Sequence, residues 1–376
     1  MNAAAGESSV RSCDAARQPA EVLTDADRRA LRAWRSHCRV RRGTLPSGVR
    51  PVRTRLIRAV GEGSLPDAGR VFVKVMGFPR WEDKIRYLFR RLPARHEADL
   101  LRYLRRHSIP CPEVLAVWTE RALVLPRFSG LVTRGLCSDG RELSPADSIP
   151  LIRQLIAARV HHPDLHGDNF LGLADGRVAV LDVQSARILR FGFARRHRVA
   201  MTAKWLMHLR SPRGAAADLL EQEGVLSAAE RRAAERLSEV LYRRQWCRRI
   251  ERCFKESSDY AVSRGCDHVL YRRRAVGSDA GEWLSGGREL RDLWIGDRVR
   301  EQWDGEPPVC VALREDRFRV GGRYRLQVLA PLSSELREAL RLACARYREV
   351  RAGGAFPGTA GIHRDRLQSA AIDSDR

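Results

Sequence analysis

The chain has 376 residues, 44% of them hydrophobic, and its 69 Lys and Arg against 46 Asp and Glu give a formal net charge of +23. This length is sufficient for two or three domains with buried cores, and the charge favours anionic partners without bearing on the fold. The nine cysteines have no CxxC pair and no zinc-type spacing, which argues against a cysteine-based metal site and for reduced thiols.

The sequence also bears on location. Nearly all basic residues are arginines, a bias that a GC-rich genome would produce, and lysine occurs only at positions 74, 84, 204 and 255. The N-terminal segment lacks the apolar core of a signal peptide, and no segment approaches the roughly 18 apolar residues of a membrane helix. We expect a soluble, cytoplasmic protein, and peripheral contact with an anionic inner membrane stays open.

The first third of the chain predicts short strands and two helices. Residues 1–22 should be disordered, and Thr24 can cap the helix that follows. An amphipathic helix is predicted over residues 94–107 and ends at Ser108-Ile109-Pro110. Residues 126–128 resemble a crossover to the rest of the chain. Strands are predicted at residues 52–60, 70–76, 114–118 and 122–125.

The middle of the chain predicts helices around a polar loop and a hairpin. Ser144 and Pro145 favour a helix start, and Pro150 would interrupt or delay that helix. Asp175-Gly176 is a good turn dipeptide for the hairpin. The elements are a loop at 161–169, strands at 170–173 and 178–181, and basic helices at 196–210 and 227–254.

Beyond residue 256 the pattern changes. A helix is predicted over residues 334–347, and residues 351–376 should be disordered. The role of residues 256–350 stays open, because they match no pattern we can name. Strands are predicted there at 269–273, 309–313 and 324–329.

The central motif is His-Pro-Asp-Leu-His-Gly-Asp-Asn at residues 162–169, and the second strand of the following hairpin ends in Asp182. Phosphoryl transfer depends on positioning and charge neutralisation. Asp164 can orient an acceptor hydroxyl or accept its proton, while Asn169 and Asp182 offer the hard oxygen ligands that Mg²⁺ prefers. The spacing matches the kinase catalytic loop H-R-D-L-x-x-x-N, with His162 in first place. The alternative interpretation is a polar turn with a capping Asp.

Two upstream residues complete a candidate nucleotide site. Lys74 lies inside an apolar strand, where it could contact the α- and β-phosphates of ATP, and Glu97 in the amphipathic helix could pair with it. The alternatives are a solvent-facing lysine on an edge strand and a solvated helix charge. Gly61 and Gly63 occupy the expected place of a phosphate-covering loop but lack the third glycine of G-x-G-x-x-G, so an ordinary hairpin turn is an equal alternative.

These residues resemble the lipopolysaccharide core kinase family, the heptose and Kdo kinases of Gram-negative bacteria. The likeness covers roughly residues 50–255. It is carried by the strand with Lys74, by a basic run over residues 86–97 that leads into His107-Ser108-Ile109-Pro110-Cys111-Pro112, and by the loop and hairpin of residues 162–182. The resemblance implies an α+β, two-lobed protein-kinase-like fold, with ATP, Mg²⁺ and a sugar hydroxyl of an envelope glycolipid as the reactants.

The resemblance and the element pattern together predict five parts in the chain. An N-terminal disordered segment and helix precede a small antiparallel sheet lobe, a mainly helical lobe and a C-terminal α/β extension, and a disordered tail ends the chain. The parts are residues 1–45, 46–128, 129–255, 256–350 and 351–376.

The motif departs from protein kinases after Asp182, where Val183-Gln184 replaces Phe-Gly, and no Ala-Pro-Glu follows in residues 183–215. A peptide acceptor is therefore less favoured. Aminoglycoside and choline phosphotransferases share the Asp164, Asn169 and Asp182 pattern and stay as alternatives, followed by a protein Ser/Thr kinase and a pseudokinase scaffold. Nucleic acid is not an expected partner, because interleaved aromatics and a binding motif are missing. The sequence does not indicate the oligomeric state.

Overall fold

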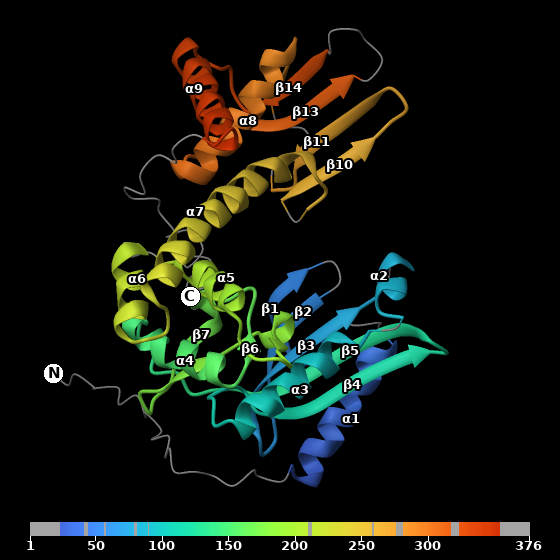
Figure 1. Cartoon of the computed structure of the whole chain (residues 1–376). Helices are drawn as coiled ribbons and strands as arrows, with labels where there is room; N and C mark the ends of the chain where they lie inside the picture. The colour runs from blue at the N-terminus through green and yellow to red at the C-terminus, as the bar shows by residue number, and fades with distance from the viewer. Residues whose placement is uncertain are drawn as a thin grey trace, which may run out of the picture. The chain divides into compact units, whose positions relative to one another are not determined.

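The computed structural model describes residues 23–40, 44–55, 58–78, 81–88, 90–209, 213–257, 259–275, 281–316 and 323–353. The disorder predicted for residues 1–22 and for most of 351–376 lies outside the described residues. The chain divides into two compact units, Met1–Ser238 and Glu239–Arg376, and helix α7, Ala228–Glu251, spans the division (Figure 1). Each unit contains helices and a five-stranded antiparallel sheet, so the chain is mixed α and β. The finer five-part division stays a prediction.

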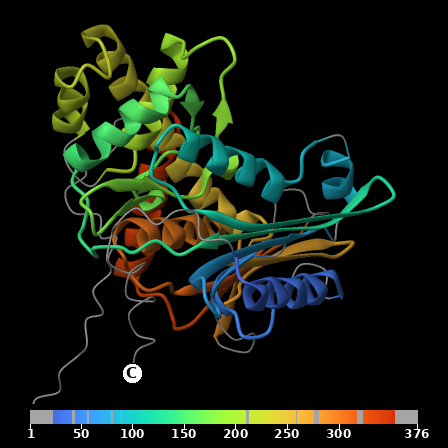
Figure 2. The ribbon, with the colours of Figure 1, turned by 90° about the horizontal axis from the view of Figure 1, so that it is seen from below.

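The sheet of the first unit has the order β1-β2-β3-β5-β4, with every neighbouring pair antiparallel. Helices α1, Asp25–Val40, and α3, Pro93–Arg106, lie on opposite faces of it (Figure 2). Buried Val71, Val73 and Val75 of β3 belong to the core that also includes Leu31 of α1. The strands are β1 Arg50–Arg55, β2 Arg58–Leu65, β3 Gly69–Gly77, β4 Val114–Ala122 and β5 Leu125–Arg134.

Four sequence expectations about the strands and helices of this unit are wrong. Residues 52–60 contain parts of two paired strands, β1 and β2, rather than one strand, and the strand predicted at 122–125 contains the β4–β5 turn. Pro126 and its neighbours belong to β5 rather than to a crossover, and Pro126 is tolerated because the register shifts beside its partner Arg121. Pro150 lies inside the continuous helix α4, Pro145–Ala157. That helix forms in spite of the proline because Ser144 and Asp147 make a complete capping box and one apolar face is buried.

The remaining elements of the first unit are short and surround the predicted catalytic loop. Strand β6 pairs with β9, and β7 pairs with β8 in the predicted hairpin, where Gly176 takes the left-handed conformation with φ +80°. Helix α6 was not predicted. These elements are α2 Trp81–Arg86, β6 Val160–His161, the 3₁₀ turn η1 Gly167–Asn169, β7 Phe170–Gly172, β8 Val178–Val180, the 3₁₀ turn η2 Val183–Ser185, β9 Arg187–Ile188, α5 Arg195–Leu206 and α6 Arg213–Gln222.

The second unit has the sheet order β10-β11-β13-β14-β12, and its helices α8 and α9 pack on each other. The predicted strands at β11, β13 and β14 and the predicted helix at α9 are present, whereas β10, β12 and α8 were not predicted. The elements are η3 Arg252–Phe254, β10 Tyr260–Arg264, β11 His268–Arg273, β12 Glu282–Gly286, α8 Arg288–Trp303, β13 Cys310–Asp316, β14 Tyr324–Val328 and α9 Ser334–Arg351.

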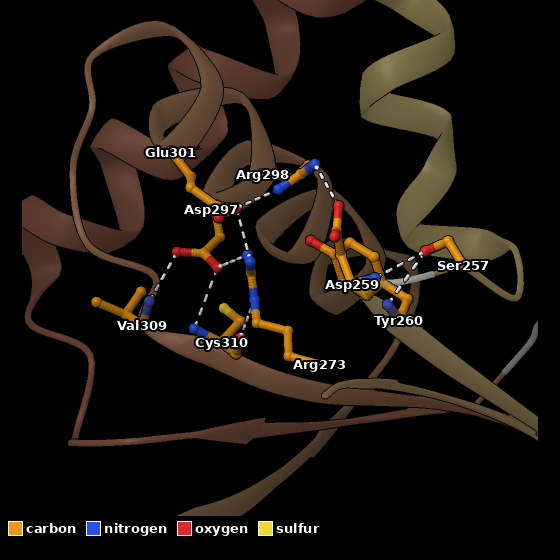
Figure 3. A network of polar contacts seen from close by, with 9 residues as sticks. All are labelled: Ser257, Asp259, Tyr260, Arg273, Asp297, Arg298, Glu301, Val309 and Cys310. Carbon is orange, nitrogen blue, oxygen red and sulfur yellow. Dashed lines mark hydrogen bonds and ion pairs between the residues drawn. The ribbon is translucent and has the colours of Figure 1, made fainter. Parts of the chain in front are cut away.

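A buried ion cluster joins α8 to this second sheet (Figure 3). Arg273 of β11 donates to Asp297 at 2.8 Å and to Glu301 at 2.6 Å. The Asp297 carboxylate also accepts the backbone N–H groups of Val309 and Cys310, at 2.9 and 3.2 Å. Buried charges are tolerated only when they are paired and hydrogen-bonded, so this cluster fixes the position of α8 on the sheet.

One further property concerns the whole described part of the chain. None of the helices that the structure describes combines the length and the apolar character needed to cross a bilayer.

Candidate functional site

Lys74 and Glu97 contact each other as the sequence predicts. Because side chains alternate along a strand, Lys74 points away from the face of β3 that buries Val73 and Val75. Its Nζ lies 2.6 Å from Glu97 Oε1. The Glu97 side chain is only 5% exposed, so its carboxylate is held by α3 and Lys74 is its cationic partner. Lys74 is therefore not the solvent-facing lysine of the alternative interpretation.

Asp182 completes a chain of contacts with this pair. It follows β8 in a left-handed backbone conformation, φ 46° and ψ 54°, and its Oδ1 lies 3.4 Å from Lys74 Nζ. Arg58 of β2 approaches the same oxygen at 3.0 Å. Burial alone would raise the pKa of Asp182, but attraction to Lys74 and Arg58 outweighs it and lowers the pKa to about 2. The carboxylate is thus ionised throughout the neutral range.

The predicted catalytic loop is held by its own residues. Leu165 is fully buried and anchors the loop in the core, and Asn169 Nδ2 donates to the Asp164 carbonyl at 2.9 Å. The Leu181 N–H donates to the Asn169 carbonyl at 2.7 Å, which links the loop to the residue before Asp182. Asn169 is buried, and because its amide nitrogen is engaged, its side-chain oxygen is the atom left to serve as a ligand.

Lys204 is a site residue to which the sequence assigned no role. It lies on α5, and its Nζ is 3.3 Å from Asp164 Oδ1. The Asp164 side chain is 58% exposed, whereas that of Lys204 is 19% exposed. The ammonium group of the more buried Lys204 therefore holds the solvent-exposed carboxylate of Asp164. The scarcity of lysine was the only signal in the sequence. Arg58 carried no such signal, because arginine is common throughout the chain.

The His162 side chain is completely buried, with no exposed surface. Burial lowers the pKa of its imidazole, against the attraction of the Asp164 carboxylate, so the ring is neutral near pH 7. Its backbone N–H lies 3.5 Å from Met201 Sδ on α5. A side chain in this place can support the loop but cannot touch a bound substrate.

The predicted glycine loop is absent. Gly61 and Gly63 lie inside β2, where they pair with Val73 and Val71 of β3. Packing restricts Gly61 most: a Cβ there would lie 2.5 Å from a Val49 methyl, whereas one on Gly63 would make a tight but less severe contact of 3.1 Å with the Trp34 ring. Gly61 and Gly63 therefore do not form the phosphate-covering loop that the sequence predicts.

The donor set fits some metals and not others. Within the described ranges, no three His, Cys, Asp or Glu side chains group as a metal site. Asn169 and Asp182 nevertheless provide two hard oxygen donors on neighbouring segments. Two protein ligands are what Mg²⁺ uses when substrate phosphates and water complete its shell, so the pair fits a magnesium–phosphate complex.

Comparisons with known proteins add little to this geometry. No protein-family model matches the sequence, and no curated protein matches it. Among solved structures, the co-crystal structure of WbdD and the kinase inhibitor LY294002 matches with 14% identity and a TM-score of 0.32, over 50% of this chain and 44% of that one. The match spans less than half of the WbdD chain. A similarity at this level assigns neither a family nor an activity to the protein.

Proposed function

We propose that the first compact unit is an ATP- and Mg²⁺-dependent phosphotransferase with a two-lobed, protein-kinase-like fold. The observation that carries the proposal is the chain of contacts from Glu97 through Lys74 to Asp182. An ammonium fixed between a buried carboxylate and an ionised one is placed to receive phosphate oxygens. It would need no rearrangement of the strand or the helix to do so.

Each residue has a distinct part in this proposal. Lys74 binds the α- and β-phosphates, and Glu97 holds it in place. Asp182 and Asn169 bind Mg²⁺. The bound Mg²⁺–ATP supplies the phosphoryl group and neutralises its charge.

Asp164 orients the acceptor hydroxyl and accepts its proton. His162 supports the loop from the buried side. Lys204 holds the Asp164 carboxylate toward α5, so that the orientation of the base is fixed before an acceptor arrives.

The acceptor in this proposal is a sugar hydroxyl of lipopolysaccharide core or a similar envelope glycolipid. One observation disfavours a peptide: only residues 186–194 separate η2 from α5, a segment too short for an extended peptide-binding platform. The net charge of +23 suits an anionic glycolipid. In the same proposal, the protein acts on this glycolipid at the cytoplasmic face of an anionic membrane.

The test is a phosphotransfer assay with Mg²⁺–ATP and three acceptor classes, namely core sugars, aminoglycosides and peptides. We expect transfer to core sugars that is lost in Asp164→Asn and Lys74→Met, while Lys255→Met, the same change on the second unit, keeps wild-type activity. Transfer only to peptides or aminoglycosides would reject the acceptor. Absence of ATP binding in the wild type would reject the phosphotransferase itself.

A further inference from the structure

Five large apolar side chains of the first unit are exposed around one turn of its sheet. Leu123 is 99% exposed and Val124 is 62% exposed, both at the β4–β5 turn, and Trp81 of α2 is 66% exposed. Figures 1 and 2 both place α2 beside this turn, and α2 packs against β5. We call the group the apolar apex; its residues are Trp81, Ile85, Leu123, Val124 and Leu125.

The two halves of the apolar apex are linked by Arg121. Its guanidinium donates to the carbonyl of Val124 in the turn at 2.8 Å, and to the carbonyls of Leu88 and Arg90 after α2 at 3.1 and 3.0 Å. One side chain therefore ties the turn to the α2 segment. It also satisfies three backbone oxygens that would otherwise need water, which lowers the cost of moving the apex into an apolar medium.

The surroundings of the apex are basic. Of the charged side chains in residues 81–91 and 119–127, six are cationic and three acidic, a net charge of +3. Three cations have acidic partners, since Arg86 pairs with Asp83, Arg91 with Asp99, and Arg127 with Glu120. Lys84 and Arg90 form no ion pair within the part of the chain that the structure describes. The third acidic residue of these two segments, Glu82, is exposed on α2 and belongs to none of these three ion pairs.

We infer that the apolar apex docks the protein on an anionic membrane surface. Large apolar side chains that are exposed together mark a contact site. The combination of Trp and aliphatic side chains with surplus cations matches the interface of a bilayer with negative lipids. The inference names the surface that would make the membrane contact included in the proposed function, but it uses none of the residues of the candidate site, so it can hold whether or not the protein transfers phosphate.

The test is co-sedimentation of the full chain with phosphatidylcholine vesicles, with and without phosphatidylglycerol. The main variant is Leu123→Asn/Val124→Ser, because asparagine tolerates the left-handed φ of 55° at position 123. Trp81→Ala/Ile85→Ser removes the α2 half of the apex independently. Leu342→Ser, an exposed leucine on α9, is the matched control. Circular dichroism confirms that each variant is folded.

We expect the wild type to bind only vesicles with phosphatidylglycerol, and less at high salt. Both apex variants should lower the partition coefficient roughly tenfold or more, while Leu342→Ser binds as wild type. Lys84→Gln/Arg90→Gln should weaken binding at low salt and have little effect at high salt. Equal binding to both vesicle types, or wild-type binding by the two apex variants, would overturn the inference. If those variants bind vesicles as wild type and only lose self-association in vesicle-free solution, the apex contacts a second copy of the chain instead.

Discussion

Replacement of Asp297 by Asn should destabilise the second unit by several kcal/mol. The Asp297 side chain is 2% exposed, and Asn keeps its size but removes its charge. Arg273 then loses one of two acidic partners. Asn has one acceptor oxygen instead of two, so the backbone N–H that faces its amide nitrogen, that of Val309 or that of Cys310, also loses its acceptor. Breaking a buried pair costs about 3–5 kcal/mol. Because Arg273 retains Glu301 at 2.6 Å, we expect the lower end of that range, about 3 kcal/mol.

The assay is amide hydrogen exchange read on peptides that cover Val309 and β13. A loss of about 3 kcal/mol corresponds to exchange roughly 100-fold faster at Val309 and Cys310. Glu338→Gln is the control, since Glu338 and Arg341 form an exposed pair at 3.7 Å on α9, and such pairs contribute less than about 1 kcal/mol. Equal protection of β13 in both variants would refute the reasoning that the cluster holds α8 on the sheet.

Three further predictions concern the first unit. Gly61→Ala should lower the free energy of unfolding by about 1–3 kcal/mol with unchanged ATP affinity, because its Cβ would lie 2.8 Å from the Arg50 carbonyl oxygen; weaker ATP binding at unchanged urea midpoint would restore the glycine-loop interpretation. Asp182 has a pKa lowered to about 2 from 3.8, so its stabilisation is present above about pH 4 and is lost as the pH falls toward 2. After allowance for solvent screening of a side chain that is 44% exposed, Asp182→Asn should lose about 1 kcal/mol at pH 7 and almost nothing near pH 2, and a pH-independent difference in urea unfolding would contradict this. Lys204→Met should lower kcat roughly 10- to 100-fold with little change in the KM for ATP, Lys204→Arg should recover part of the loss, and an effect on KM alone would exclude a positioning role.

The part of the candidate site that sequence predicts is local. The alternation of Val and Lys in β3 places Lys74 opposite the buried valines, and the amphipathic pattern of α3 indicates the helix that carries Glu97. The loop from Asp164 to Asn169 and its hairpin form one short segment. Each of these features depends on residues close together in the chain, so pattern alone is sufficient to find them.

The part that sequence does not predict depends on contacts between distant residues. Arg58 meets Asp182 across 124 positions, and nothing distinguishes it from the other arginines. Gly61 lies within a strand, where it pairs with Val73, and Val49 and Leu45 leave no room for a Cβ there. Gly296 weakens the helix signal of α8, yet a Cβ there would lie 1.9 Å from the Leu340 carbonyl oxygen of α9. At both glycines tertiary packing overrides the local preference for a turn or a break.

The left-handed backbone at Asp182 limits which residues can occupy that position. Only glycine and the short polar residues Asn and Asp adopt φ of 46° readily, and among these only Asp carries a negative charge. Asp182→Glu should therefore be more damaging than Asp182→Asn, although it keeps the negative charge. The longer glutamate side chain is unfavourable in this backbone conformation and would displace the carboxylate from Lys74. Backbone geometry and electrostatic demand together leave a single side chain that satisfies both.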